Sequence, residues 1–273
     1  MKKGGFHLDK WFLDFVGEEG ETYIFYAAKL KWHRIVVPYT SIIHYDPQKG
    51  VNVMSRFKKV QMPQQSNNCL IKWSDPVHHV EGSWSANSIP IQQRIYSSGE
   101  GYLDWFCYQP ASDVTLNIHG KKLKGKGYAE QLILTATPWS IPMDELRWGR
   151  FGSDAGSMVW IELKGFQTKS WLWFNGKQVD NFSISDNELI LSDENIKLQL
   201  DMGVVLESEN KIHSVTKNLM NFIPGFNKLM PLQFLMAEEH KWLSKGLLIK
   251  GKEIISNGYA IHELVNFKPK LTS

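Results

Sequence analysis

One acidic residue stands in a stretch that otherwise suits an apolar interior. Glu130 follows Tyr128 by two residues and precedes Leu132 and Leu134, and alternate residues of a strand share one face. If that face points into a barrel, burial disfavours the ionised form and raises the pKa of a carboxyl, as a general acid requires. Glu130 is therefore the first candidate for a proton donor, with Tyr128 beside it as a second catalytic candidate.

Each of these two residues also has a structural alternative. Glu130 could pair with Arg147 or Arg150, which would lower the pKa of a carboxyl and leave no acid. Internal charges in small barrels are more often paired than catalytic. Tyr128 recurs as Tyr259 in a repeat described below, and a repeated residue more often serves the fold than a reaction.

A second acid candidate and a set of large or basic side chains complete the candidate site. Asp104 lies in residues 101–105, which repeat the tyrosine-x-acid pattern, and its alternation neighbours are Tyr102 and Phe106. Tryptophan rings can shape a pocket or stabilise a developing carbocation, although core packing is their commoner role. The candidate ligand-binding residues are Trp105, Trp139, Trp148, Arg147 and Arg150.

Other chemistries find little support in the sequence. Cys69 and Cys107 form no CxxC pair, so a zinc site of the usual spacing is not expected. The adjacent histidines His78 and His79 would point to opposite faces of a strand and could not easily share one metal. No Walker loop, GxGxxG or GxSxG motif occurs, which argues against nucleotide binding and α/β-hydrolase chemistry. We expect neither a metal nor a cofactor.

Composition narrows the class of protein further. Lys and Arg number 31 and Asp and Glu 28, a net charge of +3, which argues against a dedicated nucleic-acid binder. The sequence has no apolar run long enough for a membrane-spanning helix and no secretory signal. We expect a cytoplasmic protein that binds a hydrophobic small molecule, with a peripheral membrane contact or a homodimer left open.

The elements that must position these residues are mostly strands. Strand-forming residues fill runs such as 131–135 and 158–163, and Asn175-Gly176 is typical of a hairpin turn. Helical periodicity is confined to 216–222 and 236–244, where short helices are expected. Many short strands separated by turns predict a sandwich or an antiparallel barrel.

An internal repeat indicates how these strands are organised. Residues 120–134 (GKKLKGKGYAEQLIL) align without a gap with 251–265 (GKEIISNGYAIHELV). A weaker echo aligns Phe15–Tyr26 with Phe151–Glu162. Because the stronger match lies at matching ends of two halves, duplication is the better explanation.

Duplication predicts an all-β protein with two lipocalin-like (calycin) barrels, at residues 1–148 and 149–273. Barrels of this size hold one small apolar ligand. Glu130 corresponds to Ile261, so we expect the main cavity in or beside the first barrel, with Glu130 and one of the three tryptophans on its wall. The Met-rich residues 219–236 could plug the second barrel, cover a site as a lid, or contact a partner.

Four motifs carry a resemblance to a known family. They are WFCYQP, GKGYAE, PWSIP and LRWGRF at 105–110, 125–130, 138–142 and 146–151. Together they resemble the lipocalin-like family of carotenoid 1,2-hydratases (hydroxyneurosporene synthases) and AttH-type proteins. The resemblance implies two calycin-like barrels, and activities that include hydration of acyclic carotenoids and, in fungal relatives, cyclisation or Diels–Alder chemistry.

The family's motif also implies a role for one residue. In the hydratases it resembles Gly-Tyr-His-Asp-His-Asn, with the Asp as proton donor to an isoprenoid double bond. Here Gly127 to Leu132 match it, with Tyr128 kept and Glu130 in the place of the acid. The His-Asn pair that follows the acid is absent, so fold and pocket carry over more safely than reaction type.

Two functions are compatible with the sequence. The first is a cofactor-independent hydratase, isomerase or cyclase of an isoprenoid, polyene or polyketide, with Glu130 as the acid. The second is a non-catalytic carrier of an apolar ligand. A closed pocket with an unpaired Glu130 would favour the enzyme, and an open pocket with a paired Glu130 the carrier.

Overall fold

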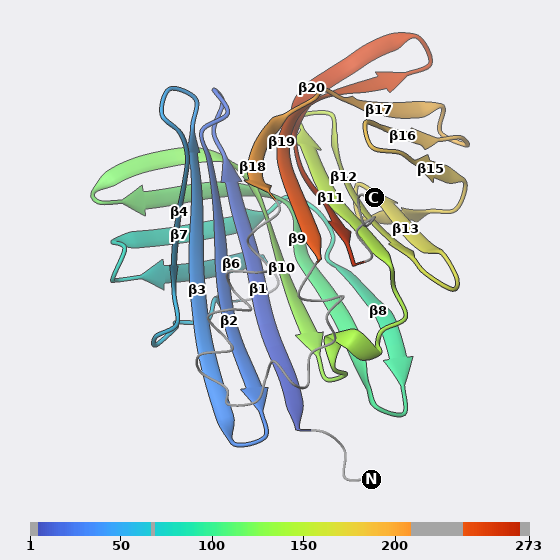
Figure 1. Cartoon of the computed structure of the whole chain (residues 1–273). Coiled ribbons are helices and arrows are strands. Elements are labelled where there is room, and N and C mark those ends of the chain that lie inside the picture. Colours follow the sequence, from blue (N-terminus) through green and yellow to red (C-terminus); the bar gives the residue numbers. More distant parts are fainter. Residues whose placement is uncertain (1–4, 67–68, 209–236, 268–273) are drawn as a thin grey trace, which may run out of the picture. The chain divides into compact units, whose positions relative to one another are not determined.

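The computed structural model describes residues 5–66, 69–208 and 237–267. The chain divides into two compact units, Met1–Ile141 and Pro142–Ser273, and both are all-β (Figure 1). The expected boundary near residue 148 falls inside a strand of the second unit, Glu145–Ser153. The expected helix at 216–222 and the Met-rich segment 219–236 lie outside the described residues.

Ten strands of the first unit form one antiparallel sheet. Its strand order is β4-β3-β2-β1-β10-β9-β7-β6-β5, with β8 also paired to β9. The long strand β9 pairs with β8 through its first half and with β7 through its second half. The strands are Phe6–Val16 (β1), Thr22–Trp32 (β2), Ile35–Asp46 (β3), Gly50–Arg56 (β4), Gln64–Ser66 (β5), Leu70–Asp75 (β6), Val80–Ala86 (β7), Ile91–Ser98 (β8), Gly101–Ile118 (β9) and Lys121–Leu134 (β10).

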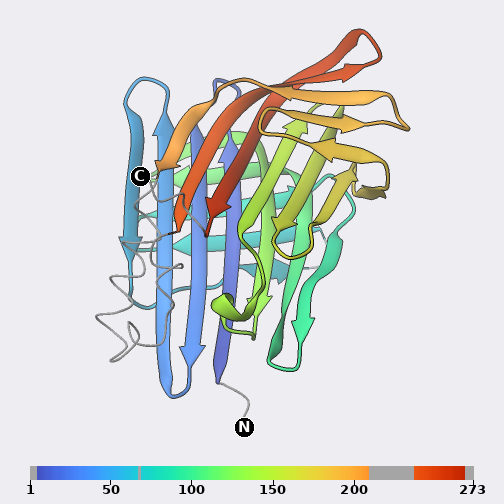
Figure 2. The same ribbon diagram turned by 45° about the vertical axis from the view of Figure 1, so that its right-hand side comes forward.

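The second unit repeats this sheet strand for strand. Its order is β14-β13-β12-β11-β20-β19-β17-β16-β15, with β18 paired to β19. The long hairpin of β19 and β20, red in Figure 2, takes the place of β9 and β10. The strands are Glu145–Ser153 (β11), Gly156–Lys164 (β12), Lys169–Phe174 (β13), Lys177–Val179 (β14), Phe182–Ile184 (β15), Glu188–Leu191 (β16), Ile196–Leu200 (β17), Val204–Ser208 (β18), Glu238–Lys250 (β19) and Glu253–Asn266 (β20).

The matching strand orders confirm the predicted duplicated all-β fold. The expected helix at 236–244 is wrong where the structure describes it, because residues 238–244 belong to β19, which pairs along its length with β20. The Asn175-Gly176 turn between β13 and β14 is present, with Asn175 at φ 51° and Gly176 at φ 76°. Within the described residues, no helix is long and apolar enough to cross a membrane. The cytoplasmic location, a peripheral membrane contact and a homodimer stay predictions.

Two glycines show why the repeated motif recurs. Gly127 and Gly258 occupy the same place in β10 and β20, and at each a β-carbon would collide with a carbonyl oxygen of the neighbouring strand. That oxygen belongs to Asp14 in β1 and to Gly152 in β11. The motif therefore keeps glycine where two backbones approach closely.

The weaker echo is out of register with the strands. It aligns Phe15 with Phe151, but Leu13 faces Ala129 and Phe151 faces Ala260. Because Ala129 and Ala260 correspond in the repeat, Phe151 corresponds to Leu13. The gapless alignment of Phe15–Tyr26 with Phe151–Glu162 is out of register because the turn between β1 and β2 is longer than the turn between β11 and β12.

Aromatic rings fill the interior of the first unit. Trp84, fully buried, donates its indole N–H to the Asp14 carbonyl oxygen over 2.7 Å. Figure 1 shows β6 and β7 crossing behind β1 to β4, so that rings from both sets of strands meet between them. This core includes Trp11, Leu13, Phe15, Tyr23, Phe25, Trp73, Trp84 and Ala129.

The second unit has its own core of the same kind. Phe151, Trp160 and Ala260 pack there with leucines of β16 and β17. Ala129 and Ala260 thus hold equivalent core positions in the two units. The residues on either side of each alanine must point to the opposite face of the sheet.

Candidate functional site

Tyr128 and Glu130 lie on the face of β10 that points away from the core of the first unit. Ala129 between them packs with Leu13 in that core. Both side chains are nevertheless buried: Tyr128 is 0% exposed and Glu130 8%. The hypothesis that this face points into the barrel is therefore replaced by a different arrangement, in which both faces of β10 are buried here.

Two hydrogen-bond donors converge on one oxygen of Glu130. The indole N–H of Trp105 and the hydroxyl of Tyr128 each donate to Oε2 over 2.5 Å. An indole N–H can only donate, so Oε2 acts as an acceptor here. A proton bound to this carboxyl would therefore be carried by Oε1.

A cysteine extends the network behind Tyr128. Cys107 is fully buried in β9 directly opposite Glu130, and its thiol is hydrogen-bonded to Tyr128. Burial raises the pKa of the Cys107 thiol well above its usual range. Burial, followed by the nearby Cys107 and Glu130, raises the pKa of Tyr128 in the same way. Both groups therefore keep their protons at neutral pH, and Tyr128 contacts Cys107 on one side while it donates to Glu130 on the other.

Apolar rings and a second carboxylate lie on the same face. Phe12 of β1 faces Glu130 across the strands and packs edge-on against Tyr128, with centroids 6.0 Å apart. Phe12 packs in the same manner against Tyr26, at 5.4 Å. Asp14, fully buried, faces Tyr128 across β1 and β10. The Glu130 cluster, defined as Trp105, Cys107, Tyr128 and Glu130, thus has aromatic rings beside it.

Sequence reasoning missed Cys107, Phe12 and Asp14. Alternation along β9 places Cys107 on the face of Trp105, so spacing alone could have found it. Asp14 interrupts the apolar run from Trp11 to Val16, and a carboxylate in a buried strand is a usable signal. No local pattern marks Phe12.

Asp104 is not part of the Glu130 cluster. It faces Ile133 across the strands, on the sheet face opposite Trp105. Its two carboxylate oxygens accept from Arg94 over 2.6 and 2.8 Å. The structure therefore shows Asp104 in a two-pronged ion pair with an exposed arginine and separates it from Glu130.

The remaining candidate residues are spread over both units. Trp139, in the 3₁₀ turn Pro138–Ser140, packs against Trp32 with ring centroids 5.8 Å apart. In the second unit, Arg147 forms ion pairs with Glu145, Glu162 and Asp186. Trp148 and Arg150 are buried in β11, and the Arg150 guanidinium donates to the Tyr259 carbonyl oxygen over 3.2 Å. The pairing of Glu130 with an arginine stays a prediction.

The second unit has a different set of residues at the equivalent place. Ile261 takes the position of Glu130, and Lys241 that of Trp105. Lys241 is fully buried, and its ammonium lies 2.7–3.1 Å from three carboxylates, Glu207, Glu239 and Glu263. Duplication therefore produced the same sheet in both units, whereas the Glu130 carboxyl that accepts from Trp105 and Tyr128 belongs to the first unit.

Metal-ligating side chains are not concentrated near this cluster. In the part of the chain that the structure describes, no three His, Cys, Asp or Glu side chains gather as a metal-binding group. The adjacent His78 and His79 lie in the turn between β6 and β7 and not on a strand, and their rings make separate contacts. The His78 ring contacts Asp75 at 2.8 Å, whereas His79 lies elsewhere, beside His119.

Comparison with known proteins shows the fold. No family model matches the sequence, and no curated protein matches it by sequence. Among solved structures, the AttH-like protein NE1406 from Nitrosomonas europaea is 7% identical, with 95% of this chain and 92% of that chain covered and a TM-score of 0.55. CghA is 12% identical, with 96% and 88% covered and a TM-score of 0.60.

Two further structures extend the comparison. CghA with Sch210972 has a TM-score of 0.54 at the same identity and coverage. Kievitone hydratase from Nectria haematococca, also 12% identical over 96% of this chain and 89% of that chain, has a TM-score of 0.49. The NE1406 and CghA structures confirm, for the fold, the resemblance to AttH-type, lipocalin-like proteins that the motifs predicted.

Proposed function

We propose that the chain is an enzyme that transfers a proton to or from a carbon–carbon double bond of a hydrophobic small molecule. The substrate class is an isoprenoid, polyene or polyketide, and the outcome is hydration, isomerisation or cyclisation. One observation supports this above others: a buried glutamate whose Oε2 accepts hydrogen bonds from both Trp105 and Tyr128. Such an arrangement fixes the carboxyl in one orientation, as proton transfer requires.

In the proposed reaction the protonated Glu130 is the acid. Oε1 gives its proton to one carbon of the double bond, and a cation develops on the other carbon. The carboxylate left behind is stabilised by the N–H of Trp105 and the O–H of Tyr128 through Oε2. Aromatic ring faces can stabilise the cation.

Three outcomes then close the cycle. In hydration, water adds to the cation and its surplus proton returns to Glu130. In isomerisation, Glu130 takes a proton from the neighbouring carbon. In cyclisation, a second double bond attacks the cation before that proton is lost. Each route regenerates the acid and needs no cofactor.

Tyr128 serves this proposal as a donor, with Cys107 beside it. Because burial raises the pKa of each, neither gives up its proton at neutral pH. Tyr128 therefore remains a donor to Glu130 throughout the cycle. We assign it the stabilisation of the carboxylate, with Glu130 as the only proton-transfer residue.

The carrier alternative is weakened by the core of the first unit. A carrier of the lipocalin type holds its ligand in the hollow of a barrel. Here that interior contains six large rings, among them Trp84 at 0% and Trp73 at 4% exposed. These rings leave the core of the first unit filled, which is unlike the open hollow of a carrier.

A substrate screen in heavy water tests the proposal. The chain is incubated with acyclic isoprenoids, polyenes and linear polyketides in D₂O, and products are followed by mass spectrometry. Hydration adds the mass of D₂O, whereas isomerisation or cyclisation leaves deuterium on carbon. Conversion by the wild type, absent in Glu130→Gln, supports the enzyme. Tight binding of a compound that is never converted would favour the carrier.

A further inference from the structure

Two histidines meet at one end of the first unit, far along the strands from Glu130. His79 ends the turn between β6 and β7, and His119 begins the turn between β9 and β10. Their ring centroids are 5.2 Å apart, with planes tilted by 45°. Both border a cavity of about 510 Å³, together with Glu81 and Asn117. The fold thus brings two imidazoles together from turns that are distant in sequence.

Both histidines hold a backbone conformation that ordinary residues avoid. His79 has φ 51° and His119 φ 50°, in the left-handed region that favours glycine and, less strongly, asparagine, aspartate and histidine. The main-chain N–H of His119 donates to the carbonyl oxygen of His79 over 2.9 Å. The turns are therefore joined at their backbones, which holds the two imidazoles near one another.

The second unit forms the same junction with unremarkable residues. There the N–H of Gly251 donates to the carbonyl oxygen of Asn195, also over 2.9 Å. Asn195 has φ 53° and Gly251 φ 62°. Since asparagine and glycine satisfy this geometry with little strain, the junction itself does not call for histidine. What distinguishes the first unit is that two imidazoles meet at this junction.

Polar groups beside the histidines complete a set of donor atoms. Glu81 of β7 and Asn117 of β9 face each other, two residues along the strands from His79 and His119. Oδ1 of Asn117 is buried and accepts no hydrogen bond from any residue that the structure describes. Glu81 is an exposed residue. An acceptor and a carboxylate therefore lie next to the paired imidazoles.

We infer that His79 and His119 bind a divalent transition-metal ion of the Zn²⁺, Ni²⁺ or Cu²⁺ class. Imidazole nitrogen is a preferred ligand of these ions. A third protein ligand is not already in place, and exposed Glu81 must turn its side chain to supply one. Asn117 Oδ1 is placed to accept a hydrogen bond from metal-bound water. None of these residues belongs to the Glu130 cluster, so the site is separate from the proposed reaction.

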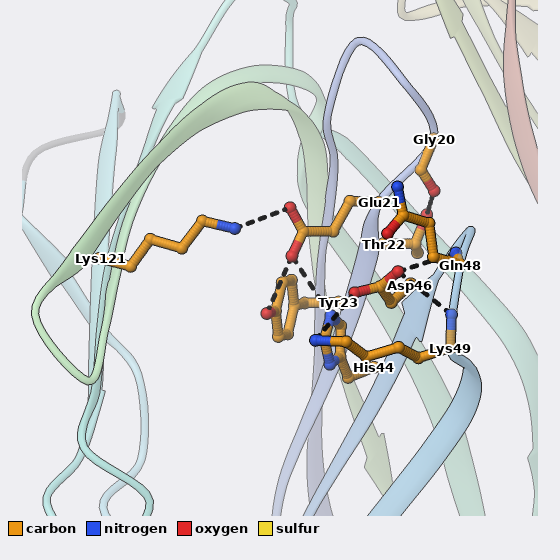
Figure 3. A network of polar contacts seen from close by, with 9 residues as sticks. All are labelled: Gly20, Glu21, Thr22, Tyr23, His44, Asp46, Gln48, Lys49 and Lys121. Carbon is orange, nitrogen blue, oxygen red and sulfur yellow. Dashed lines mark hydrogen bonds and ion pairs between the residues drawn. The ribbon is translucent and has the colours of Figure 1, made fainter.

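The position of the site suggests what the metal does. The β9–β10 hairpin is already held by Lys121, whose ammonium contacts Glu21 at 3.5 Å (Figure 3). Glu21 also accepts from Tyr23 and contacts the ring of His44, which stacks on Tyr23. A metal between His79 and His119 would join the β9–β10 turn to the β6–β7 turn as well, and would stabilise the folded state by mass action.

The test titrates the full chain, without an affinity tag, with Zn²⁺ or Ni²⁺ alone. Because Cys69 is an exposed thiol, the parent protein carries Cys69→Ser. His79→Asn and His119→Asn are the test variants, since asparagine accepts the left-handed conformation and already fills it at Asn195. Calorimetry should show one ion per chain for the parent, and each variant should bind at least about tenfold more weakly.

A matched control shows whether metal binding is specific to His79 and His119. His33→Asn makes the same change at another histidine of positive φ, 53°, and should leave affinity unchanged. The metal should also raise the melting temperature of the parent and of His33→Asn, but of neither test variant. In the wild type, Ni²⁺ should broaden the ring NMR signals of His79 and His119 first, a readout that needs no variant. Equal affinity in all four proteins, or no binding at millimolar metal, would overturn the inference.

Discussion

The hydroxyl of Tyr128 donates to Glu130 Oε2 over 2.5 Å, from a position two residues earlier on the same strand. Residues i and i+2 of a strand share a face, so β10 alone presents an acid together with a donor to it. Trp105 reaches the same oxygen from β9. Proton transfer by Glu130 depends on this arrangement in ways that can be measured.

Tyr128→Phe should lower turnover more than it lowers binding. The change removes one of two donors that stabilise the carboxylate after proton transfer, so we expect kcat to fall about 10–100-fold with KM little changed. It also removes a buried hydrogen bond to a carboxyl group, which should reduce the free energy of unfolding by about 1–3 kcal/mol. Steady-state kinetics and urea denaturation measure the two effects.

Tyr108→Phe is the matched control for that change. Tyr108 lies in β9, and its hydroxyl donates to Gln131 Oε1 over 3.0 Å, beside the core ring of Trp11. Because Gln131 faces away from Glu130, we expect about 1 kcal/mol of lost stability and unchanged turnover. Equal losses of kcat in both variants would show that Tyr128 acts only through stability.

Gly127→Ala and Gly258→Ala should both destabilise the protein, each in its own unit. At both positions the new methyl group would collide with a main-chain oxygen, of Asp14 or of Gly152, which cannot move without breaking the strand pairing. We expect losses above about 2 kcal/mol in thermal or urea melts. Gly99→Ala, where no atom lies within 4 Å, should stay within about 0.5 kcal/mol of the wild type.

His262 should be neutral in the folded protein down to low pH, in one tautomer. The Ser244 hydroxyl donates to the Asp201 carbonyl oxygen over 3.2 Å, and it lies 3.0 Å from His262 Nε2. Because a carbonyl oxygen can only accept, the hydroxyl proton is used there and Nε2–H must donate to Ser244. Nitrogen NMR should therefore show a protonated Nε2 and a lone pair on Nδ1.

This histidine should also make stability depend on pH. Burial lowers the pKa of His262 from 6.5 to about 4, so the unfolded chain binds the proton first as the pH falls. Its contribution to stability is therefore complete above pH 6.5 and is lost progressively toward pH 4, by about 3 kcal/mol in all. In urea melts, His262→Gln should remove this part of the slope. Glutamine is chosen because Gln131 occupies the corresponding place in β10. Parallel pH profiles for the wild type and His262→Gln would contradict the assignment.

The sequence repeat predicted the fold well because it recorded a backbone requirement. Gly127 and Gly258 are kept where a β-carbon would strike the next strand, so they mark equivalent strands in both halves. The contact between Glu130 and Trp105 could also have been predicted, because both residues follow the alternation of long strands. Local spacing carries information of this kind.

The choice of face could not be predicted locally. Alternation separates Tyr128 and Glu130 from Ala129, but both faces of β10 are buried, and the pairing of Leu13 with Ala129 decides which one is the core. Residues 236–244 look helical by periodicity, yet pairing with β20 makes residues 238–244 part of a strand. Long-range contacts overrode local preference in both cases.

The most direct test of the account compares turnover by the wild type and by Glu130→Gln on a substrate found in the D₂O screen. The amide keeps an oxygen to accept from Trp105 and Tyr128 but cannot deliver a proton. We predict turnover at least about 100-fold lower, with binding of an apolar fluorescent probe within about threefold and a melting temperature near that of the wild type. If turnover stays within a few-fold of the wild type, or if its loss only follows a loss of stability and binding of the kind an ion-paired Glu130 would show, Glu130 is not the acid.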